Sequence, residues 1–413
     1  MDEVTVEKLI SNGRGLARYS DGRVIFIEGA LPGERWSIED IVKRKGCFWA
    51  TGKRLTDVPE RMEPACPHYG TCGGCALLHI HPRFELKFKV DYLRDVLSRV
   101  GDLNLTDIKS VDFPPAQSRI RGKLHVDQAG NIGFHQERAN RVTPIKTCHV
   151  LPTSLMALIP NLAKVIKTAR FEGDIYFMTN AKCLDPKLEL QGSVKVGGAD
   201  EEIWSELPVS GLLLRDVDGT PLLSLGDPNT AFQWGEFKVS LPPRSFVQSN
   251  PASWPVFGEA VSNYLAQWQP ERVWDAHAGA GFLSSFLRGV EVWVSEPNRH
   301  TFDQLRENLK HMGMPHRAFQ GTAEAAIKRN FFQAKAHDGL ILDPPREGLT
   351  NPLRQWVVDK GPNSLLYFSC DMGSFARDLR HLMEGYRLEN PMTVMNVNPG
   401  TLRIEVAAVL LRR

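Results

Sequence analysis

The chain has 413 residues, of which 42% are hydrophobic and 24% are charged, so it can bury several cores and should fold as two or three domains. Its 50 basic and 48 acidic residues leave a net charge of only +2, so bulk charge does not mark a nucleic-acid-binding protein. No long apolar run or basic leader is present, and seven cysteines do not suit a disulfide scaffold of this size, which together predict a cytoplasmic protein without a membrane span.

Residues 1–57 are predicted to form a small OB-like β-barrel. The segment Gly15–Glu28 should be a hairpin that turns at Asp21-Gly22, a pair that tolerates positive φ. Five basic residues surround Phe48 and Trp49, namely Lys43, Arg44, Lys45, Lys53 and Arg54. Cations beside exposed aromatic residues suit single-stranded RNA, whereas the ordinary alternative is a solvated edge with the aromatic residues in the core. The sequence leaves both open.

Residues 58–240 are predicted to form a β-rich central domain with one long helix. That helix should begin near Pro82 and end at Gly101, with its apolar side chains on one stripe, and it could pack on the C-terminal domain. In the strand-rich sequence that follows, six basic residues outnumber two acidic ones: Arg119, Arg121, Lys123, Arg138, Arg141 and Lys146. This group predicts contact with phosphate, and a charged sheet face is the ordinary alternative.

Four cysteines of the central segment predict a metal site. They are Cys66, Cys72, Cys75 and Cys148, the first three in the pattern Cys-x5-Cys-x2-Cys. Four thiolates suit either Zn²⁺ or an iron–sulfur cluster, and the spacing does not separate the two. Cys47 and Cys183 lack partners at ligand spacing and are expected to be packing residues. Three nearby histidines are expected to lie at the surface or cap other elements, and the alternative is that they substitute as ligands: His68, His79 and His81.

Residues 241–413 alternate between short apolar runs and helical patterns. The strand candidates end at Trp274, Val294, Leu342 and Phe368, and each is followed by a turn and a helical pattern. Such βα units predict a doubly wound parallel sheet whose ligands bind beyond the carboxyl ends of the strands. The motifs described below fall at those ends.

A glycine-rich turn follows the first of these strands. Asp275, Gly279 and Gly281 form the pattern Asp-x3-Gly-x-Gly, and Glu296 lies 21 positions after Asp275, just past the next strand. The glycines allow close approach of a cofactor, and Glu296 could accept hydrogen bonds from ribose hydroxyls. The final glycine of the dinucleotide fingerprint is absent, which favours a single nucleoside such as S-adenosylmethionine over NAD. An ordinary tight turn is the alternative.

Two further strand ends carry Asp343-Pro344-Pro345-Arg346 and Cys370. A methyl donor beside a thiolate would suit methylation of an unreactive ring carbon, because a thiolate that adds to C6 of uracil makes C5 nucleophilic. A base must then remove the C5 proton so that the thiolate can leave. The alternative for Cys370 is a buried packing residue at a strand end.

Taken together, these motifs resemble the RNA 5-methyluridine methyltransferases, the uracil-C5 family that acts on tRNA and large-subunit ribosomal RNA. Six segments carry the resemblance: Arg244–Asn250, the Gly279/Gly281 turn, Asp343–Gly348, Ser369-Cys370, Phe375–Leu379 and Pro399–Glu405. Upstream, the cysteine pattern, Gly133-Phe134-His135 and the turn Ala30–Glu34 also match, the last of these resembling the TRAM domain of the ribosomal members. The resemblance therefore covers nearly the whole chain.

The resemblance implies an α/β fold with three domains. Residues 1–57 would form a TRAM-like RNA-binding barrel, residues 58–240 a β-rich central RNA-binding domain with the cysteines, and residues 241–413 a Rossmann-like S-adenosylmethionine-dependent methyltransferase. It implies a [4Fe–4S] cluster on the four cysteines, Cys370 as nucleophile and Glu405 as base. The implied methyl-donor contacts are Gln248, Glu296 and Asp343, beside Asp275, Gly279 and Gly281 of the turn.

The expected substrate is RNA, preferably large-subunit (23S) ribosomal RNA, with tRNA as the alternative, and the protein is expected to act as a monomer. Three segments depart from the usual family pattern: Asp371-Met372 replaces Asn-Pro, Arg403 replaces histidine, and Ala276-His277-Ala278 occupies the glycine-rich turn. A carboxylate beside Cys370 would raise the pKa of the thiol. These departures motivate a different class of function, an RNA-binding or assembly factor on an impaired enzyme scaffold.

Overall fold

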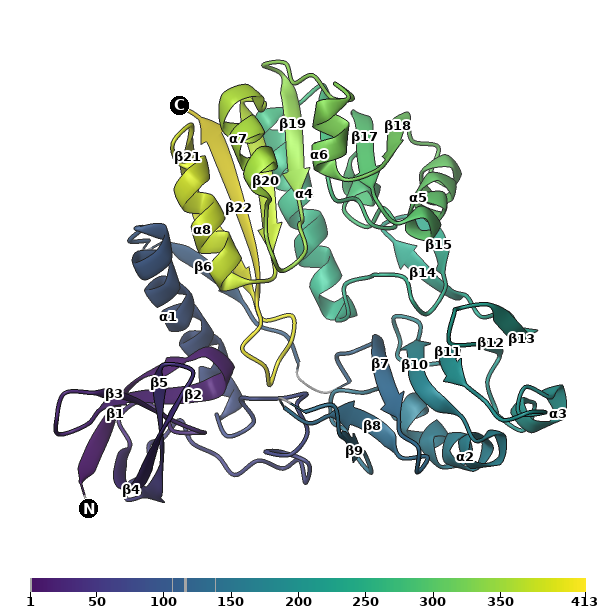
Figure 1. The fold of residues 1–413 in the computed structure, drawn as a ribbon. Helices are drawn as coiled ribbons and strands as arrows, with labels where there is room; N and C mark the ends of the chain where they lie inside the picture. The colour runs from purple at the N-terminus through teal and green to yellow at the C-terminus, as the bar shows by residue number, and fades with distance from the viewer. Residues whose placement is uncertain (1, 106, 115–116, 138) are drawn as a thin grey trace.

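The computed structural model describes residues 2–105, 107–114, 117–137 and 139–413, so Arg138 of the basic group lies outside the described residues. A barrel, a central sheet and a large C-terminal sheet follow one another along the chain (Figure 1). In these described ranges, no helix combines the length and apolar composition that crossing a bilayer requires.

The N-terminal segment forms a closed five-stranded barrel with the order β1-β2-β3-β5-β4. Its strands are β1 Glu3–Ile10, β2 Arg14–Arg18, β3 Val24–Ile27, β4 Arg35–Arg44 and β5 Cys47–Arg54. The predicted hairpin is confirmed, since β2 pairs with β3 and Gly22 in the turn has φ +85°. Phe48 packs against the barrel core with its ring half-buried below Arg23, while Trp49 lies below Arg14. Phe48 thus combines a core contact with an exposed cation, whereas the cation over Trp49, Arg14, is itself buried.

The central segment forms a seven-stranded sheet with the order β13-β12-β11-β10-β7-β8-β9. Its strands are β7 Arg121–Val126, β8 Ile132–His135, β9 Val142–Pro144, β10 Glu172–Met178, β11 Lys187–Ser193, β12 Gly211–Arg215 and β13 Pro221–Gly226. Alternate residues such as Leu124, Ile175 and Leu190 pack with the apolar face of helix α2, Thr153–Ala169. The other residues of these strands, including Arg121 and Lys123, therefore project from the opposite face. A short helix α3, Glu201–Trp204, and a hairpin of β14 Thr230–Trp234 and β15 Phe237–Leu241 complete this part.

The C-terminal sheet has eight strands with the order β18-β17-β16-β19-β20-β22-β21-β6. They are β6 Ile108–Val111, β16 Arg272–Asp275, β17 Glu291–Glu296, β18 His316–Gln320, β19 Asp338–Leu342, β20 Ser364–Ser369, β21 Tyr386–Met395 and β22 Glu405–Arg412. The strands from β18 to β20 are parallel as predicted, but β22 runs antiparallel to both of its neighbours. The edge strand β6 comes from residues assigned by sequence to the central segment.

Five helices accompany this sheet: α4 Trp254–Trp268, α5 Arg299–His311, α6 Ala323–Lys328, α7 Asn351–Lys360 and α8 Met372–Leu382. The helix predicted after the glycine-rich turn is wrong, because the chain there forms only turns and a 3-10 segment, η3 Ser284–Phe286. Ser284 donates its hydroxyl to Asp275 and Ser285 donates its hydroxyl to the Phe282 carbonyl, so local side-chain bonds compete with a regular helix. Two further 3-10 segments are η1 Ser11–Gly13 and η2 Pro251–Ser253.

Helix α1, Pro82–Gly101, has the predicted bounds and packs against α8 (Figure 1). Its buried residues Val90, Leu93 and Leu97 share one core with Phe375 and Leu379 of α8. The helix thus covers the C-terminal sheet on the side where β22 and β21 lie.

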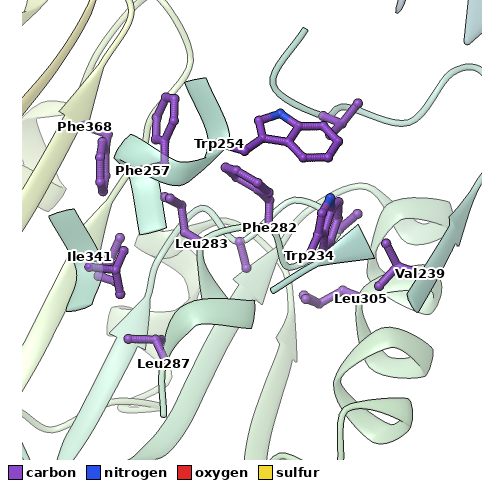
Figure 2. Packing of buried hydrophobic residues seen from close by; sticks show 14 of the residues in the cluster. Trp234, Val239, Trp254, Phe257, Phe282, Leu283, Leu287, Leu305, Ile341 and Phe368 are labelled. Carbon is purple, nitrogen blue, oxygen red and sulfur yellow. The ribbon is translucent and has the colours of Figure 1, made fainter. Parts of the chain in front are cut away.

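A cluster of aromatic rings lies beneath the carboxyl ends of the strands (Figure 2). Phe282, directly after Gly281, has its ring centroid 5.4 Å from that of Trp234 and 5.8 Å from that of Phe257. Phe257 in turn lies 5.3 Å from Phe368, two residues before Cys370. Aromatic pairs at such distances add about 1 kcal/mol each beyond their burial. The cluster therefore fixes the glycine-rich turn relative to the end of β20.

Candidate active site

The glycine-rich turn leaves the end of β16 with space beside its backbone. Gly279 and Gly281 have φ values of +53° and +95°, in the left-handed region that favours glycine. A Cβ at Gly281 would come within 3.0 Å of Leu305, whereas a Cβ at Gly279 would meet no heavy atom within 4 Å. Gly281 thus serves close packing against α5, and Gly279 borders open space that a ligand can occupy.

Two acidic side chains, Asp275 and Glu296, lie at this turn. Asp275 is fully buried; its Oδ2 accepts a hydrogen bond of 2.7 Å from Ser284, and its Oδ1 has no partner among the described residues. Burial raises the pKa of Asp275 to about 6. Burial also raises the pKa of Glu296 at the end of β17, and the backbone N–H groups of Asn298 and Gly279 oppose that rise. An orphaned buried acceptor and a neighbouring carboxylate suit a ligand that brings hydrogen-bond donors, as a nucleoside does.

Asp343 and Glu405 extend this acidic group towards Cys370. Burial, and then the charge of Asp275, raises the pKa of Asp343 to about 7. Glu405 is only 5% exposed, and burial followed by the charge of Asp343 raises its pKa well above the ordinary value. The Oε2 atom of Glu405 has no hydrogen-bond partner among the described residues. Burial and mutual repulsion thus favour the protonated forms of these carboxyl groups more than an exposed site would, and a bound cation or donor would offset that effect.

Cys370 lies at the end of β20, opposite Glu405 at the start of β22. Ser369 pairs with Val406 in the antiparallel ladder, so the next position along β20 faces Glu405. Burial raises the pKa of the Cys370 thiol to about 12; the charges of Glu405 and Asp343 add to this, and Arg346 opposes it. A thiol and a carboxylate on facing strand ends can act in turn on one bound molecule.

The structure shows the surroundings of two of the three departures from the family pattern, Asp371-Met372 and His277. Asp371 is the N-cap of α8, with its Oδ1 accepting a hydrogen bond of 2.8 Å from the Ser374 N–H, and its charge contributes least among the causes that raise the pKa of Cys370. Met372 is buried in the core beneath α8. His277 is half-buried, and burial lowers its pKa to about 4, so its ring is neutral at physiological pH. Asp371 thus acts mainly on the helix.

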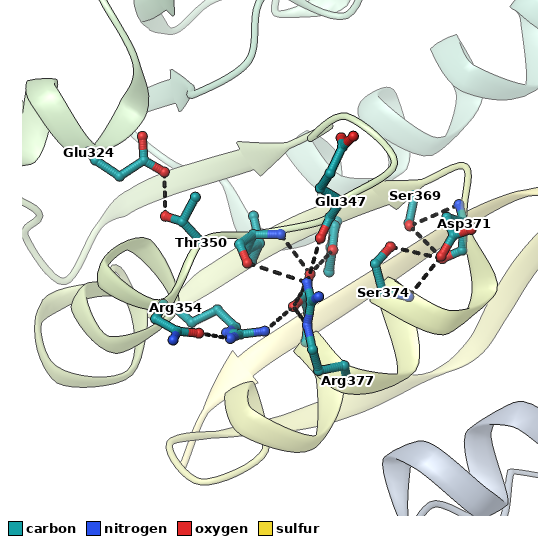
Figure 3. A network of polar contacts seen from close by, with 12 residues as sticks. Glu324, Glu347, Thr350, Arg354, Ser369, Asp371, Ser374 and Arg377 are labelled. Atoms are coloured by element: carbon teal, nitrogen blue, oxygen red, sulfur yellow. Dashed lines mark hydrogen bonds and ion pairs between the residues drawn. The ribbon is translucent and has the colours of Figure 1, made fainter. Parts of the chain in front are cut away.

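The loop that follows Asp343 is held by the buried carboxylate of Asp378. Figure 3 labels Glu347, Arg354 and Arg377, which take part in the surrounding contacts. Asp378 accepts hydrogen bonds from the Leu349 N–H and the Tyr367 hydroxyl, both at 2.7 Å, and from Arg354 at 2.6 Å. Arg377 pairs with the same carboxylate and donates to the Glu347 carbonyl at 2.7 Å. These contacts fix the end of the loop, at Glu347 and Leu349, and so restrain Asp343 and Arg346 at its start.

Four arginines gather between the central sheet and this site: Arg119, Arg121, Arg346 and Arg403. Burial lowers the pKa of Arg403 most, and the charges of Arg346 and Arg119 lower it further. Burial, followed by the charge of Arg119, lowers the pKa of Arg121 to about 10. In the described part of the chain, none of the four forms an ion pair with a carboxylate. Such a cluster is ready to accept an anionic ligand.

The predicted basic group of the central segment therefore divides in two. Arg119 lines the cavity of the four cysteines and lies near enough to Arg403 to lower its pKa, and Arg121 lies near Arg119. Lys123 instead pairs with Asp174 at 3.0 Å on a charged sheet face. The sequence reasoning missed Phe246, whose side chain is 53% exposed and lies 5.0 Å from the Arg121 guanidinium. The position of Phe246, two residues before the predicted methyl-donor contact Gln248, was the feature of the sequence that could have indicated it. An exposed aromatic ring beside a cation is a stacking surface for a base.

Gln248 is buried in the loop between β15 and α4. Its carbonyl accepts a hydrogen bond of 2.9 Å from the Trp254 indole, and the Trp254 ring lies 5.8 Å from Phe282 beside the glycine-rich turn. The aromatic cluster thus links Gln248 to the turn.

The four predicted cysteine ligands line one cavity, together with Arg119. Burial raises the pKa of the Cys75 thiol to about 12 and raises those of Cys72 and Cys148, and the cysteines raise one another's pKa values further. Among the described residues, no group of three or more His, Cys, Asp or Glu side chains is arranged to hold a metal ion. The donor set itself, four soft thiols that line one cavity, would suit Zn²⁺ or an iron–sulfur cluster.

The other candidate ligands lie outside this role. His68 accepts a hydrogen bond from the Lys146 N–H at 3.1 Å, His79 bonds to the Tyr69 hydroxyl at 2.5 Å, and His81 caps α1. Cys47 is exposed, and Cys183 donates to the Gln117 carbonyl. The expected capping role is confirmed for His81. It is wrong for His79, which is buried, and the expected packing role is wrong for Cys47, which is exposed.

Replacing Asp378 with alanine should destabilise the protein by about 3–5 kcal/mol, because Arg354 and the Tyr367 hydroxyl would lose a buried partner. Urea unfolding followed by fluorescence measures the change. Glu384→Gln is the matched control, since Glu384 is exposed and faces only His381 at 3.4 Å, and it should shift stability by less than about 0.5 kcal/mol. A loss below about 1 kcal/mol for Asp378→Ala would show that the loop is held by other contacts.

Comparison with known proteins agrees with this geometry. The TRAM domain family matches residues 3–43. The chain is 28% identical to the 23S rRNA (uracil(1939)-C(5))-methyltransferase RlmD of Thiobacillus denitrificans, covering 99% of both chains. It is 26% identical to the RlmD of Chromobacterium violaceum, covering 98% of this chain and 83% of the relative. An uncharacterised RNA methyltransferase of Halalkalibacterium halodurans is 27% identical over 99% of this chain.

The fold is shared with a solved structure. The tRNA (uracil-54, C5)-methyltransferase of Pyrococcus abyssi, in complex with S-adenosyl-L-homocysteine, superposes with a TM-score of 0.78 at 19% identity and covers 99% of both chains. The relatives named RlmD and the TRAM match confirm the resemblance to the uracil-C5 methyltransferases. The predicted fold class, a Rossmann-like C-terminal part with an N-terminal barrel, is also confirmed.

Proposed function

We propose that this protein is an S-adenosylmethionine-dependent methyltransferase that forms 5-methyluridine in RNA through a covalent bond between Cys370 and the target base. The observation that carries the proposal is the facing arrangement of Cys370 and Glu405, with Asp343 and Arg346 beside them. Similarity over nearly the whole chain to relatives named uracil-C5 methyltransferases supports the same activity.

The reaction uses the two facing groups in sequence. The Cys370 thiolate adds to C6 of the uracil, and the electron pair of the C5–C6 double bond moves to C5 and the C4 oxygen. S-adenosylmethionine would supply the methyl group: C5 would form its bond to that carbon as the methyl–sulfur bond breaks, and the electron pair would leave on the sulfur of S-adenosylhomocysteine. The Glu405 carboxylate then removes the proton from C5, the electrons of that C–H bond restore the C5–C6 double bond, and the C6–S bond breaks to return the thiolate.

The electrostatics suit these roles. A carboxylate whose pKa is raised binds a proton more tightly, so Glu405 is a stronger base than an exposed glutamate. Arg346 lowers the pKa of Cys370 and of Glu405, and it is the group we assign to stabilising the negative charge that passes between them. We assign binding of the methyl donor to Gln248, Asp275, Gly279, Gly281, Glu296 and Asp343.

The substrate we propose is large-subunit ribosomal RNA, with tRNA as the alternative. The named relatives with an RlmD activity and the TRAM match favour the ribosomal substrate, whereas the Pyrococcus abyssi enzyme acts on tRNA. The target uridine must leave its stack to reach Cys370, and the exposed Phe246 ring and the neighbouring arginines suit stacking and phosphate contact. We further propose that the protein acts as a monomer in the cytoplasm.

The proposal is tested with purified protein, S-adenosylmethionine and unmodified ribosomal RNA or tRNA. Mass mapping should find 5-methyluridine at defined positions with the wild-type protein and none with Cys370→Ala. Glu405→Gln should still form a covalent adduct with RNA but release it about 100-fold or more slowly, because the base is lost after the adduct has formed. Full methylation by Cys370→Ala would remove the mechanism, and failure of the wild type on every RNA would favour the assembly-factor alternative.

The rate of adduct formation should rise with pH. Because burial and neighbouring carboxylates raise the pKa of the Cys370 thiol to about 12, only a small fraction is thiolate near neutral pH. While the pH is below the pKa, the thiolate fraction grows about tenfold for each unit by which the pH rises. The ionised fraction of Glu405 also increases as the pH rises. Trapping on 5-fluorouridine RNA between about pH 6.5 and 8.5, followed on denaturing gels, measures the slope. A flat profile would mean that the bound state already holds a thiolate.

We also propose that Cys66, Cys72, Cys75 and Cys148 hold a [4Fe–4S] cluster that supports the structure. Anaerobically purified protein should contain about four iron atoms and four sulfides per chain and absorb in the visible region, and Cys75→Ser should lose most of both. Cys183→Ser is the control and should retain them, because Cys183 lies outside the cavity. Stoichiometric zinc without sulfide would contradict the cluster and leave a zinc site.

A further inference from the structure

Helix α1 carries a buried ion pair directly beneath the segment that ends at Glu405. Lys89 has no exposed surface and Glu85 is 5% exposed, and the Lys89 Nζ lies 2.6 Å from the Glu85 Oε1. The segment above them, residues 396–404, connects β21 to β22 and is here called the base loop. The two side chains come from a part of the sequence more than 300 positions earlier.

Lys89 donates hydrogen bonds along much of the base loop. Its Nζ lies 2.5 Å from the Asn396 Oδ1, 3.2 Å from the Asn398 carbonyl and 3.2 Å from the Arg403 carbonyl. One ammonium group therefore contacts the start, the middle and the end of the loop. Its last contact is two residues before Glu405.

Glu85 holds the turn of the same loop. Its two carboxylate oxygens accept hydrogen bonds from the Gly400 N–H at 2.9 and 3.0 Å. Gly400 has φ +78°, and its carbonyl accepts from the N–H groups of Ala76 and Leu77, both at 2.9 Å. The turn is thereby held on one side by α1 and on the other by the residues after Cys75.

Stability alone does not explain this pair. Removing a lysine and a glutamate from water costs several kcal/mol per ion, and apolar residues of similar volume often serve as well or better. What apolar residues cannot supply is a set of directed bonds to three backbone groups and one amide of an irregular loop. The pair thus selects one conformation of the base loop.

We propose that Glu85 and Lys89 are positioning residues that fix the base loop and thereby set the Glu405 carboxylate for removal of the C5 proton. This inference rests on the proposed function. Neither residue contacts the reacting atoms. A displaced loop would leave Cys370 on β20 in place, so formation of the C6–S bond should continue while the later proton removal slows.

The double variant Glu85→Gln/Lys89→Met separates the two steps. It removes both charges together and leaves no buried ion unpaired. In 5-fluorouridine RNA the C5 atom carries fluorine, so no proton can be removed after methyl transfer, and the adduct reports only the earlier steps. Its rate of formation should stay within about twofold of wild type, while turnover on uridine RNA should fall about 10- to 100-fold. The covalent complex with uridine RNA should accumulate on denaturing gels.

Lys87→Met is the matched control, because Lys87 lies on the exposed face of α1 and pairs only with Asp91. It should behave as wild type in both assays. Thermal unfolding of each variant checks the fold, and should the double variant unfold, Asn396→Leu removes one loop contact and should show the same split to a smaller degree.

The inference fails if the double variant turns over uridine RNA at the wild-type rate, or if adduct formation and turnover fall in parallel. These results differ from failure of the proposed function, in which the wild type and Lys87→Met would also methylate no RNA.

Discussion

The Cys370 thiol and the Glu405 carboxyl face one another in a buried space. Both groups are acidic, and they cannot easily carry negative charge at the same time. Like charges in a poorly solvated site raise each other's pKa, and Asp343 and Asp275 extend the same effect back to the glycine-rich turn. The site is therefore short of positive charge at its centre, although arginines lie at its border. A cationic methyl donor would offset the negative charge at the centre, and an RNA phosphate would offset the positive charge of the border arginines.

The rest of the fold keeps the strand ends that form this site at fixed distances. The aromatic cluster joins the turn after β16 to the end of β20, and Asp378 fixes the loop after β19. The start of β22 depends on a different source of support, the Glu85–Lys89 pair of α1. The aromatic cluster, Asp378 and the Glu85–Lys89 pair each hold a different segment, so a substitution in one of them should not have the same effect as a substitution in another.

The sequence predicted features whose determinants are local. The bounds of α1 follow from Pro82 and Gly101, and the glycine-rich turn and the ends of the parallel strands follow from short-range patterns. What it did not predict depends on residues distant in the chain. Glu85 and Lys89, four positions apart, have the spacing of an ordinary surface ion pair, and only the base loop shows why they are buried. The sequence predicted that Asp371 raises the pKa of Cys370, because its role as the N-cap of α8 is visible only once the start of that helix is known.

The edge position of β6 has a consequence for how the molecule assembles. Asp112, directly after β6, bonds to Asn396 across 284 positions, so β21 gains its outer neighbour from a strand synthesised long before it. During translation β6 must wait, unpaired, until nearly the whole polypeptide has left the ribosome. Pairing of β6 with β21 is thus a late, long-range step, and such non-local pairing is slow. The unpaired edge of β6 would be a binding site for chaperones until that step.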